Sequence, residues 1–451
     1  MPKNRASEVV KGKCANDFEP CVLGGLTAST RVSSADNGVP VSVESLLHSS
    51  RRASVWSFDK QMRCVARPVE NVFSGGHAEV VRLRLASGRS VDMTTEARLL
   101  TIDGWARLGA LAVDDRIAIP RCIPKPLRTK GMPDSEVILL AHMIGDGSCV
   151  ERQPIRYASI DEENLTAVAE AATHFGVTAI RDEYAAARVT TLRLPAPYRL
   201  THGKRNPIAQ WLDGLGLFGL RSYEKFVPDP VFSMPTDKVA LFLKHLWATD
   251  GSIRWDKTGR QARIYYASTS LRLIDDVAAL LLRFGVHGRI KLVPKAGYRD
   301  CWHLMIDGGE NQIAFLEGVG CHGARGVAGA ACLVELETMT SNTNVDTIPK
   351  EVWNQVRALL AAGGITHREF QAAMGSKFCG STMWKHSPSR ARLARAANIL
   401  GAPELAMLCT NDVFWDRITE ITGLGEQEVY SVTVSGTENL IAQGISVYAG
   451  L

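Results

Sequence analysis

The middle of the chain contains an internal repeat, which constrains the fold more than any other feature of the sequence. Tyr157–Ser159 and Phe175–Val177 recur as Tyr266–Ser268 and Phe284–Val286, each displaced by 109 residues, with a helical run between the two segments in both copies. Two matches at one displacement indicate a duplicated supersecondary unit. The sequence therefore predicts two related units around a pseudo-two-fold axis.

Each unit begins with an apolar run that ends in Asp-Gly-Ser, at Asp146 in the first copy and at Asp250 in the second. Helices that meet at the axis of a duplicated fold bring equivalent residues together, so we expect these two aspartates to be neighbours. His142 and His245 are larger than close helix packing favours. Small residues that permit such packing are also present in both runs: Ala141, Gly145, Ala248 and Thr249.

Two neighbouring carboxylates suit a divalent metal, because they repel each other unless cations lie between them, and hard oxygen ligands favour Mg²⁺. A metal there can activate water against a phosphodiester, with one carboxylate serving each strand of a duplex. A single Asp-Gly is most often only a turn after a helix. Its recurrence in repeat register instead predicts a hydrolytic metal site at Asp146 and Asp250.

Both runs resemble the LAGLIDADG motif of homing endonucleases, over about residues 136 to 310, and Lys225–Phe232 is similar to the K-x-I-P segment of intein-borne, DOD-type members. The resemblance implies a metal-dependent endonuclease that acts as a monomer on a long, asymmetric double-stranded DNA site, with Mg²⁺ as cofactor and Mn²⁺ as a substitute. It assigns metal binding and catalysis to Asp146 and Asp250. It also implies central basic residues, for which the candidates are Lys225, Lys291 and Lys295. A lysine on a strand is otherwise most often solvated.

The pattern of the chain changes several times along its length. Short alternating runs such as Val80–Leu85, followed by the turn Ala86–Gly88, predict β-hairpins from about Leu26 to Arg121. After a Pro-rich stretch, helices and strands alternate, a helical segment follows, and β alternation returns in Glu428–Val434. The sequence thus predicts an α+β, multidomain chain whose β domain is split by insertions. Its expected parts are a tail (1–24), the first half of the β domain (25–125), a duplicated α/β domain (126–330, with repeats at about 136–215 and 225–310), a helical module (331–410) and the second half of the β domain (411–451).

The two β segments resemble the halves of an intein splicing domain, and they are most similar to inteins that interrupt replicative DNA helicases. Leu26–Val32, Thr101–Leu108 and Asn439–Val447 carry the likeness, which covers about 25–121 and 428–449. It implies a mostly-β, horseshoe-like (Hint) fold that the endonuclease domain splits.

Splicing needs a nucleophile at the first position, a His in a T-x-x-H turn and a terminal His-Asn pair. Aligned by these motifs, Gly25 stands at the nucleophile position, and the turn begins at Thr94 and has Ala97 in place of the His. At the C-terminal end of the likeness, a His, an Asn and a hydroxyl or thiol residue are expected in that order. The sequence has Tyr448, Ala449 and Gly450 there instead. A start at Cys21 would restore only the nucleophile. With 24 residues before Gly25 and one or two after the end, we expect no flanking segments to join and no splicing.

Positive charge gathers in the helical segment, where residues 350 to 402 carry a net charge of +6. Thr366–Glu369 forms a capping box that opens one helix, which stops at Gly375-Ser376, and a second helical run follows. The pair resembles a helix-turn-helix, whose second helix could lie in the major groove with cations on phosphates. The candidate DNA-binding residues are Lys385, Arg390, Arg392 and Arg395. The alternative is a solvated basic face on an ordinary helix pair, and Trp384 fits core packing better than stacking on a base.

Composition excludes some classes and leaves others open. A net charge of +5 on 451 residues does not by itself indicate nucleic acid. We find neither an apolar run of about 18 residues nor a secretory leader, so we expect a cytoplasmic protein without a membrane partner. The ten cysteines lack C-x-x-C spacing, which favours buried free thiols over disulfides or structural zinc. Besides an endonuclease, the sequence leaves open an autoprocessing intein with an endonuclease domain, and a non-catalytic nucleic-acid binder such as an RNA-folding maturase.

Overall fold

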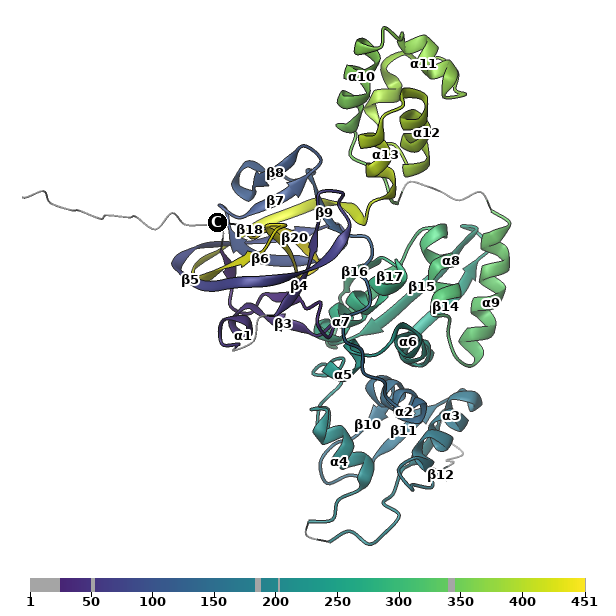
Figure 1. The fold of residues 1–451 in the computed structure, drawn as a ribbon. Helices are drawn as coiled ribbons and strands as arrows, with labels where there is room; N and C mark the ends of the chain where they lie inside the picture. The colour runs from purple at the N-terminus through teal and green to yellow at the C-terminus, as the bar shows by residue number, and fades with distance from the viewer. Residues whose placement is uncertain (1–24, 50–52, 183–187, 202, 340–344, 451) are drawn as a thin grey trace, which may run out of the picture.

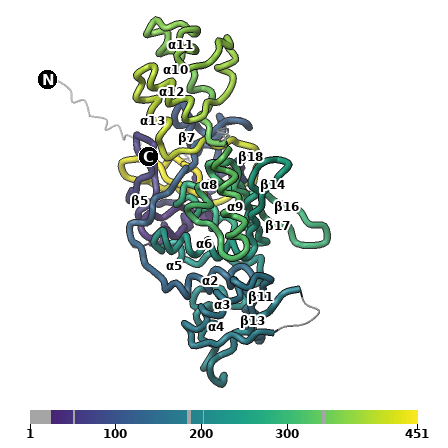
Figure 2. The backbone as a smooth tube through the Cα atoms, turned by 90° about the vertical axis from the view of Figure 1, so that its right-hand side faces the viewer, coloured from purple at the N-terminus to yellow at the C-terminus, as the bar shows by residue number. Residues whose placement is uncertain are grey.

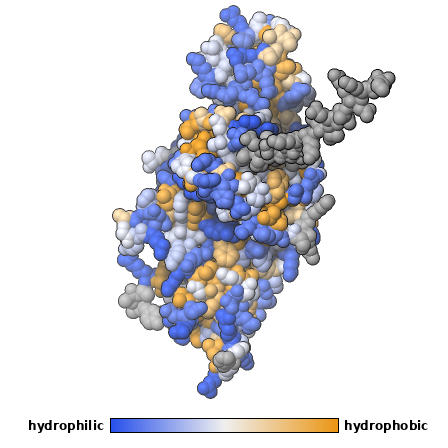
Figure 3. All heavy atoms as spheres, turned by 90° about the vertical axis from the view of Figure 1, so that its left-hand side faces the viewer, coloured by the Kyte–Doolittle hydropathy of each residue, from blue (hydrophilic) through white to orange (hydrophobic). Residues whose placement is uncertain are grey.

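The computed structural model describes residues 25–49, 53–182, 188–201, 203–339 and 345–450; the predicted tail and Cys21 lie outside the described residues. A β domain, a duplicated α/β domain and a helical module form an elongated molecule, with the helical module at one end and the first α/β repeat at the other (Figures 1 and 2). On the face shown in Figure 3, hydrophobic side chains are interspersed with hydrophilic ones. No helix within the described ranges is long and apolar enough to span a membrane.

Segments from before and after the insertions build the β domain together. One sheet has the order β4-β5-β6-β1-β18-β9 and the other the order β3-β2-β19-β20-β7-β8. β18 pairs with β5 from Ile418 opposite Leu85 to Val434 opposite Val69, so the two halves are interlocked and the predicted split domain is confirmed. The elements are β1 (Leu26–Thr27), β2 (Arg31–Ser33), β3 (Pro40–Ser42), α1 (Val43–Leu47), β4 (Ser54–Phe58), β5 (Cys64–Leu85), β6 (Ser90–Thr94), β7 (Arg98–Thr101), β8 (Gly104–Arg107), η1 (Leu108–Ala110), β9 (Arg116–Pro120), β18 (Val413–Val434), β19 (Asn439–Ala442) and β20 (Ile445–Tyr448).

The α/β domain consists of two repeats, each with a four-stranded antiparallel sheet, in the orders β10-β11-β13-β12 and β14-β15-β17-β16. The first contains α2 (Asp134–Gly145), β10 (Gly147–Ser148), β11 (Arg156–Ser159), α3 (Glu162–Thr173), β12 (Ile180–Asp182), β13 (Thr190–Arg193), α4 (Pro207–Gly214) and α5 (Asp229–Phe232). The second contains α6 (Thr236–Asp250), β14 (Gly251–Asp256), β15 (Gln261–Ser268), α7 (Leu271–Leu281), η2 (Leu282–Phe284), β16 (Gly288–Val293), β17 (Cys301–Ile306), α8 (Gly309–Gly318) and α9 (Ala324–Glu337).

The two repeats share one strand register. Gly147 pairs with Tyr157 in the first repeat, and Gly251 pairs with Tyr266 in the second. The second repeat is longer between these positions because β14 has 6 residues and β10 has 2. The matching register confirms the duplication inferred from the sequence.

The helical module comprises α10 (Val352–Ala362), α11 (His367–Ala373), η3 (Gly380–Lys385), α12 (Arg390–Leu400) and α13 (Pro403–Thr410). Its buried Trp353 and Leu393 belong to the same hydrophobic cluster as Trp56 of β4 and Ala118 of β9, so the module packs on the β domain. The predicted boundary at residue 330 falls inside α9. Because that helix contacts β14, α6 and α8, the α/β domain continues to the end of α9 at Glu337.

Candidate active site

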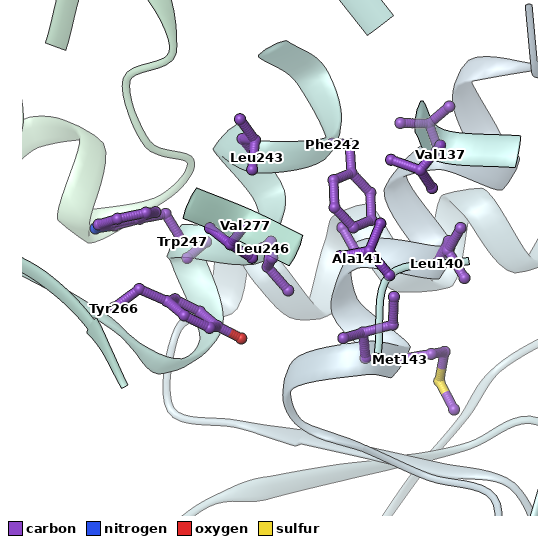
Figure 4. Close-up of a cluster of buried hydrophobic side chains, with 14 of the residues drawn as sticks. Val137, Leu140, Ala141, Met143, Phe242, Leu243, Leu246, Trp247, Tyr266 and Val277 are labelled. Atoms are coloured by element: carbon purple, nitrogen blue, oxygen red, sulfur yellow. The ribbon is translucent and has the colours of Figure 1, made fainter. Parts of the chain in front are cut away.

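The ends of α2 and α6 carry the two predicted aspartates. Asp146 is the C-cap of α2, and Asp250 is the last residue of α6. The helices pack so closely that a Cβ built on Gly145 would overlap the side chain of Thr249. Figure 4 shows the apolar side chains that join them, among them Ala141 and Phe242. The expected close packing through small residues is thus present, and it brings the two acidic ends together.

Both aspartates are exposed at the helix ends, where partial desolvation and the repulsion between their charges act on them. Desolvation and the charge of Asp250 raise the pKa of Asp146 to about 6. Desolvation also raises the pKa of Asp250, against the lowering effects of Lys225, Arg325 and Lys295. A cation beside the two carboxylates would stabilise their ionised forms, because it offsets the repulsion between them.

Two basic residues hold the helix ends in a related way. The Lys225 ammonium donates to the carbonyl oxygens of Met143 (3.0 Å), Gly145 (3.3 Å) and Gly147 (2.8 Å), where the dipole of α2 concentrates negative charge. At the end of α6, the Arg325 guanidinium donates to the carbonyl oxygen of Ala248. Both cations lower the pKa values of the two aspartates. At each helix end, one basic side chain therefore donates hydrogen bonds to the backbone carbonyl oxygens.

The three candidate lysines differ in their exposure and in their effect on the aspartates. Lys225 is buried behind the helix ends, and Lys295 is exposed but still acts on Asp250. Lys291 lies on β16 in register with His303, on the sheet face opposite the buried Ile290, and it is not among the charges that shift either aspartate. Arg325 was missed because its segment matches no motif. Only its place at the start of α9, against α6, reveals it.

The donor set at the aspartates fits a hard divalent cation. Within the described ranges, no three His, Cys, Asp or Glu side chains are grouped to hold a metal. A metal here would therefore take the carboxylates of Asp146 and Asp250, with water and substrate oxygens completing its coordination. Mg²⁺ commonly binds in this way, with few protein carboxylates and several waters.

The residues at the predicted splicing positions lie in regular backbone pairing. The Gly25 amide donates to Thr94 Oγ1 (3.0 Å), the Thr94 amide donates to the Gly25 carbonyl (3.0 Å), and the Ala97 amide donates to the Thr94 carbonyl (3.2 Å). At the other end, the Ala449 amide donates to the Glu438 carbonyl (2.7 Å). The structure thus brings Gly25, Thr94 and Ala97 together, and none of their side chains is a nucleophile with a neighbouring base.

Beside Ala449, Tyr448 and Gly450 also occupy predicted splicing positions. The Tyr448 hydroxyl donates to Glu438 Oε2 at 2.9 Å, and its ring packs edge-on against Trp105 with centroids 5.4 Å apart. A Cβ on Gly450 would lie 2.5 Å from the same hydroxyl. Tyr448 is therefore held as a packed, hydrogen-bonded side chain.

The helical module corrects one DNA-binding candidate. Arg390 is largely buried: it pairs with Asp346 (2.8 Å) and donates to the carbonyl oxygens of Leu408 (3.0 Å), Cys409 (3.2 Å) and Val413. These bonds join α12 to α13 and the start of β18, so Arg390 is a structural residue and cannot also reach a phosphate. Lys385, Arg392 and Arg395 remain exposed, with Arg395 donating to the Met374 carbonyl at 3.0 Å.

The helix pairing differs from the prediction as well. The capping box of Thr366 and Glu369 is present at the start of α11. However, residues 374–389, which include η3, separate α11 from α12, whereas only Gly363–Thr366 join α10 to α11. The short turn typical of helix-turn-helix units therefore precedes α11. Trp384 packs against Trp353 and Phe370, as core packing predicts.

Comparison with known proteins agrees with this architecture. Residues 237–320 match the LAGLIDADG-like domain family. The chain is 37% identical over 440 residues to the replicative DNA helicase DnaB of Synechocystis sp., an alignment that covers 94% of this chain and 49% of the relative; the chain thus spans about half the length of that helicase.

Two solved structures are also similar to parts of the chain. One is a DnaB intein from Synechocystis sp. PCC 6803 (34% identity, TM-score 0.21, covering 22% of this chain and 70% of that one). The other is I-DmoI in complex with DNA and Mn (17% identity, TM-score 0.29, covering 41% and 96%). The helicase similarity over 94% of the chain and the LAGLIDADG-like domain match within it support a DnaB-type intein that carries a LAGLIDADG endonuclease domain.

Proposed function

We propose that the chain cleaves both strands of one long DNA site in a Mg²⁺-dependent reaction, in which Mn²⁺ can replace Mg²⁺, and that it acts as a monomer. The observation that carries this proposal is the pairing of two solvent-accessible, mutually repelling aspartates at the ends of two tightly packed helices. The pseudo-two-fold arrangement gives a single chain one acidic residue for each strand, so a second subunit is unnecessary.

Each residue of the site has a distinct task in this mechanism. Asp146 and Asp250 hold the metal, which when bound supplies Lewis-acid chemistry at the phosphodiester. Lys225 and Arg325 are positioning residues, because they fix the carbonyl ends of α2 and α6 and favour the ionised form of both carboxylates. Lys295, exposed and within the field of Asp250, is the lysine best placed to meet substrate, and Lys291 can contact the DNA backbone from the sheet face.

A random library of duplex DNA, incubated with the full chain and Mg²⁺ and then sequenced, tests the activity. Asp146→Asn and Asp250→Asn should each reduce cleavage by about 100-fold or more, the scale of removing one electrostatic contact to a transition state, while DNA binding persists. Asp237→Asn, an exposed aspartate at the opposite end of α6, is the matched control and should cleave like the parent. If both active-site variants cleave normally, the aspartates are structural. If the parent binds DNA and never cleaves it, the chain is a non-catalytic binder.

We further propose that protein splicing is lost and that the β domain serves as a scaffold. Gly25 cannot form a thioester or ester, and the Ala449 side chain cannot cyclise. Intact mass measurement after prolonged incubation should show one species. A fragment that begins at or near Gly25 would instead support the autoprocessing alternative.

The eight described cysteines are all free, which suits the reducing conditions of the cytoplasm, where we propose that the protein acts.

A further inference from the structure

A pocket lies where the β domain meets the second endonuclease repeat, outside both sites described above. Its volume is about 310 Å³, at the lower end of the range for small-ligand sites. The β5–β6 turn, β9, the start of β18 and the start of β16 form its walls. The walls are fixed to each other: the Ile290 amide donates to the Ser87 carbonyl (2.7 Å), and a Cβ on Gly88 would overlap the Ile290 carbonyl oxygen. We call this cavity the junction pocket.

The lining of the junction pocket carries excess positive charge, with four arginines and two aspartates: Arg89, Arg116, Arg289, Arg417, Asp307 and Asp416. Three of the arginines have partners. Arg289 pairs with Asp307 (2.7 Å), Arg417 pairs with Asp114, and Arg116 donates to Thr347 Oγ1 (2.9 Å). Asp416 is also engaged, because its carboxylate accepts the amides of Ser87 and Arg417. The fourth arginine is different.

Arg89 is a buried cation with an unused donor. It directly precedes β6, the residue is 7% exposed, and Nη1 has no hydrogen-bond partner among the described residues. Burial lowers the pKa of Arg89, and the charges of Asp416 and Asp275 partly offset that effect. Loss of a proton does not relieve this desolvation of the guanidinium, because arginine stays protonated under ordinary conditions. A buried charge that is only partly compensated destabilises the fold.

Two further donors of the junction pocket are also without partners among the described residues. His287 is stacked on Phe414 with ring centroids 4.5 Å apart, and the Arg121 backbone is the one polar group near its two buried ring nitrogens, neither of which has a hydrogen bond of ordinary geometry within the described residues. Trp415 has a buried Nε1 without a partner there. Both side chains line the pocket. A native protein rarely leaves several buried donors unsatisfied in one place. Donors from a guanidinium, an imidazole and an indole, in a cavity with net positive charge, match one class of ligand.

We propose that the junction pocket binds an anion of the phosphate class, with Arg89 as its main partner and His287 and Trp415 as further donors. The three contacts would give the guanidinium, the indole and the single N–H of the neutral imidazole an acceptor, and a bidentate guanidinium suits the geometry of phosphate. Because the pocket is walled by both domains, the bound anion also fastens the β domain to the second repeat. Such a phosphate group could come from a small free molecule or from a DNA backbone.

Thermal unfolding of the full chain in inorganic phosphate, against chloride at equal ionic strength, tests the proposal. The parent should gain roughly 3–5 °C in Tm when phosphate exceeds its Kd by about 100-fold. Arg89→Met should gain nothing. It should also be no less stable than the parent in chloride, because the variant removes a buried charge that lacks a partner. Arg84→Met, a half-exposed arginine on β5 that pairs with Glu420, is the matched control and should respond to phosphate like the parent.

A second arm distinguishes the two sources. A short duplex of random sequence replaces phosphate, and DNA affinity is compared between the parent and Arg89→Met. A phosphate response with unchanged DNA affinity assigns the pocket to a small free anion, and lost DNA affinity without a phosphate response assigns it to the DNA backbone. The proposal is overturned if Arg89→Met responds to phosphate and DNA as the parent does, or if it unfolds at lower temperature in chloride, since Arg89 would then be an ordinary structural cation.

Discussion

His142 on α2 and His245 on α6 share a hydrogen bond across the pseudo-two-fold axis, with Nε2 of the first 3.0 Å from Nδ1 of the second. The other ring nitrogen of His142 lies 2.9 Å from the Tyr157 hydroxyl, and His245 stacks on His322. Both rings of the pair are buried. A hydrogen bond between two imidazoles requires that one nitrogen accept, so the two rings cannot both be protonated while the bond persists.

This arrangement predicts acid sensitivity. Burial lowers the pKa of His142 well below its usual 6.5 and that of His245 to about 3, whereas the unfolded chain has ordinary values. Between pH 6.5 and 3 the unfolded state therefore binds more protons, and the free energy of unfolding falls as pH drops, by about 1.4 kcal/mol per unit for each histidine.

Urea unfolding at pH 7, 6 and 5 measures this effect. His245→Gln should lose stability less steeply than the parent below pH 6.5, and His367→Gln, an exposed histidine on α11, should keep the parent's slope. Equal slopes for all three proteins would show that the pair does not control acid stability.

Gly145 should tolerate no side chain, because a Cβ there overlaps Thr249. Gly145→Ala is expected to lower the free energy of unfolding by about 1–3 kcal/mol, the usual cost of overpacking a core. Gly214→Ala, at a helical glycine with open space around it, is the control and should be close to neutral. The double variant Gly145→Ala/Thr249→Gly should recover part of the loss. Chemical denaturation measures all four proteins, and an unaffected Gly145→Ala would contradict the close helix contact.

Metal affinity should depend on pH through Asp146. Its pKa is raised to about 6, so the carboxylate takes up a proton as pH falls through that value, and Mg²⁺ affinity should drop by about tenfold per unit below it. Calorimetric titration with Mg²⁺ between pH 7.5 and 5 gives this profile without any DNA.

Arg325 should influence the pH at which Mg²⁺ affinity falls to half of its maximum. Arg325→Met removes a cation that lowers the pKa of both aspartates, so the midpoint should move to higher pH. Arg254→Met, at an exposed arginine on β14, should leave the midpoint in place. A midpoint for Arg325→Met that coincides with the parent's would remove Arg325 from the site.

The basic helical module should contribute to DNA affinity through Lys385 and Arg392. Replacing both with Ala is expected to reduce the slope of log affinity against log salt by about 2 units, close to one for each phosphate contact, with single-turnover cleavage unchanged. Arg390→Ala should instead destabilise the module, because Arg390 joins α12 to the start of β18. Binding titrations at several salt concentrations and thermal unfolding separate the two effects. An unchanged slope in the double variant would show that the module does not touch DNA.

The sequence predicted the features that repetition and periodicity encode. The duplication, the split β domain and the meeting of Asp146 with Asp250 all follow from patterns along the chain, because equivalent positions of two repeats must occupy equivalent places. The small residues at the helix interface, such as Gly145, were also predictable from the sequence, because close approach of two helices requires small side chains.

Other features depend on contacts that no local pattern encodes. Arg325 reaches Ala248 only because α9 folds back against α6. Arg390 carries the same charge as Arg392, and only the packing of α12 turns one inward and leaves the other exposed. The boundary at 330 and the helix pairing in the module were misplaced for a similar reason, because sequence shows where helices begin more clearly than what they pack against.

The long pairing of β5 with β18 also dictates an order of events during synthesis. β5 is complete by Leu85, yet its partner begins only at Val413. Every residue of both endonuclease repeats therefore leaves the ribosome before the β domain can close. Through that interval, β5 has an open edge of the kind that attracts other strands. We expect the endonuclease domain, whose contacts are local by comparison, to fold first and to keep the two distant segments close until the final strand arrives.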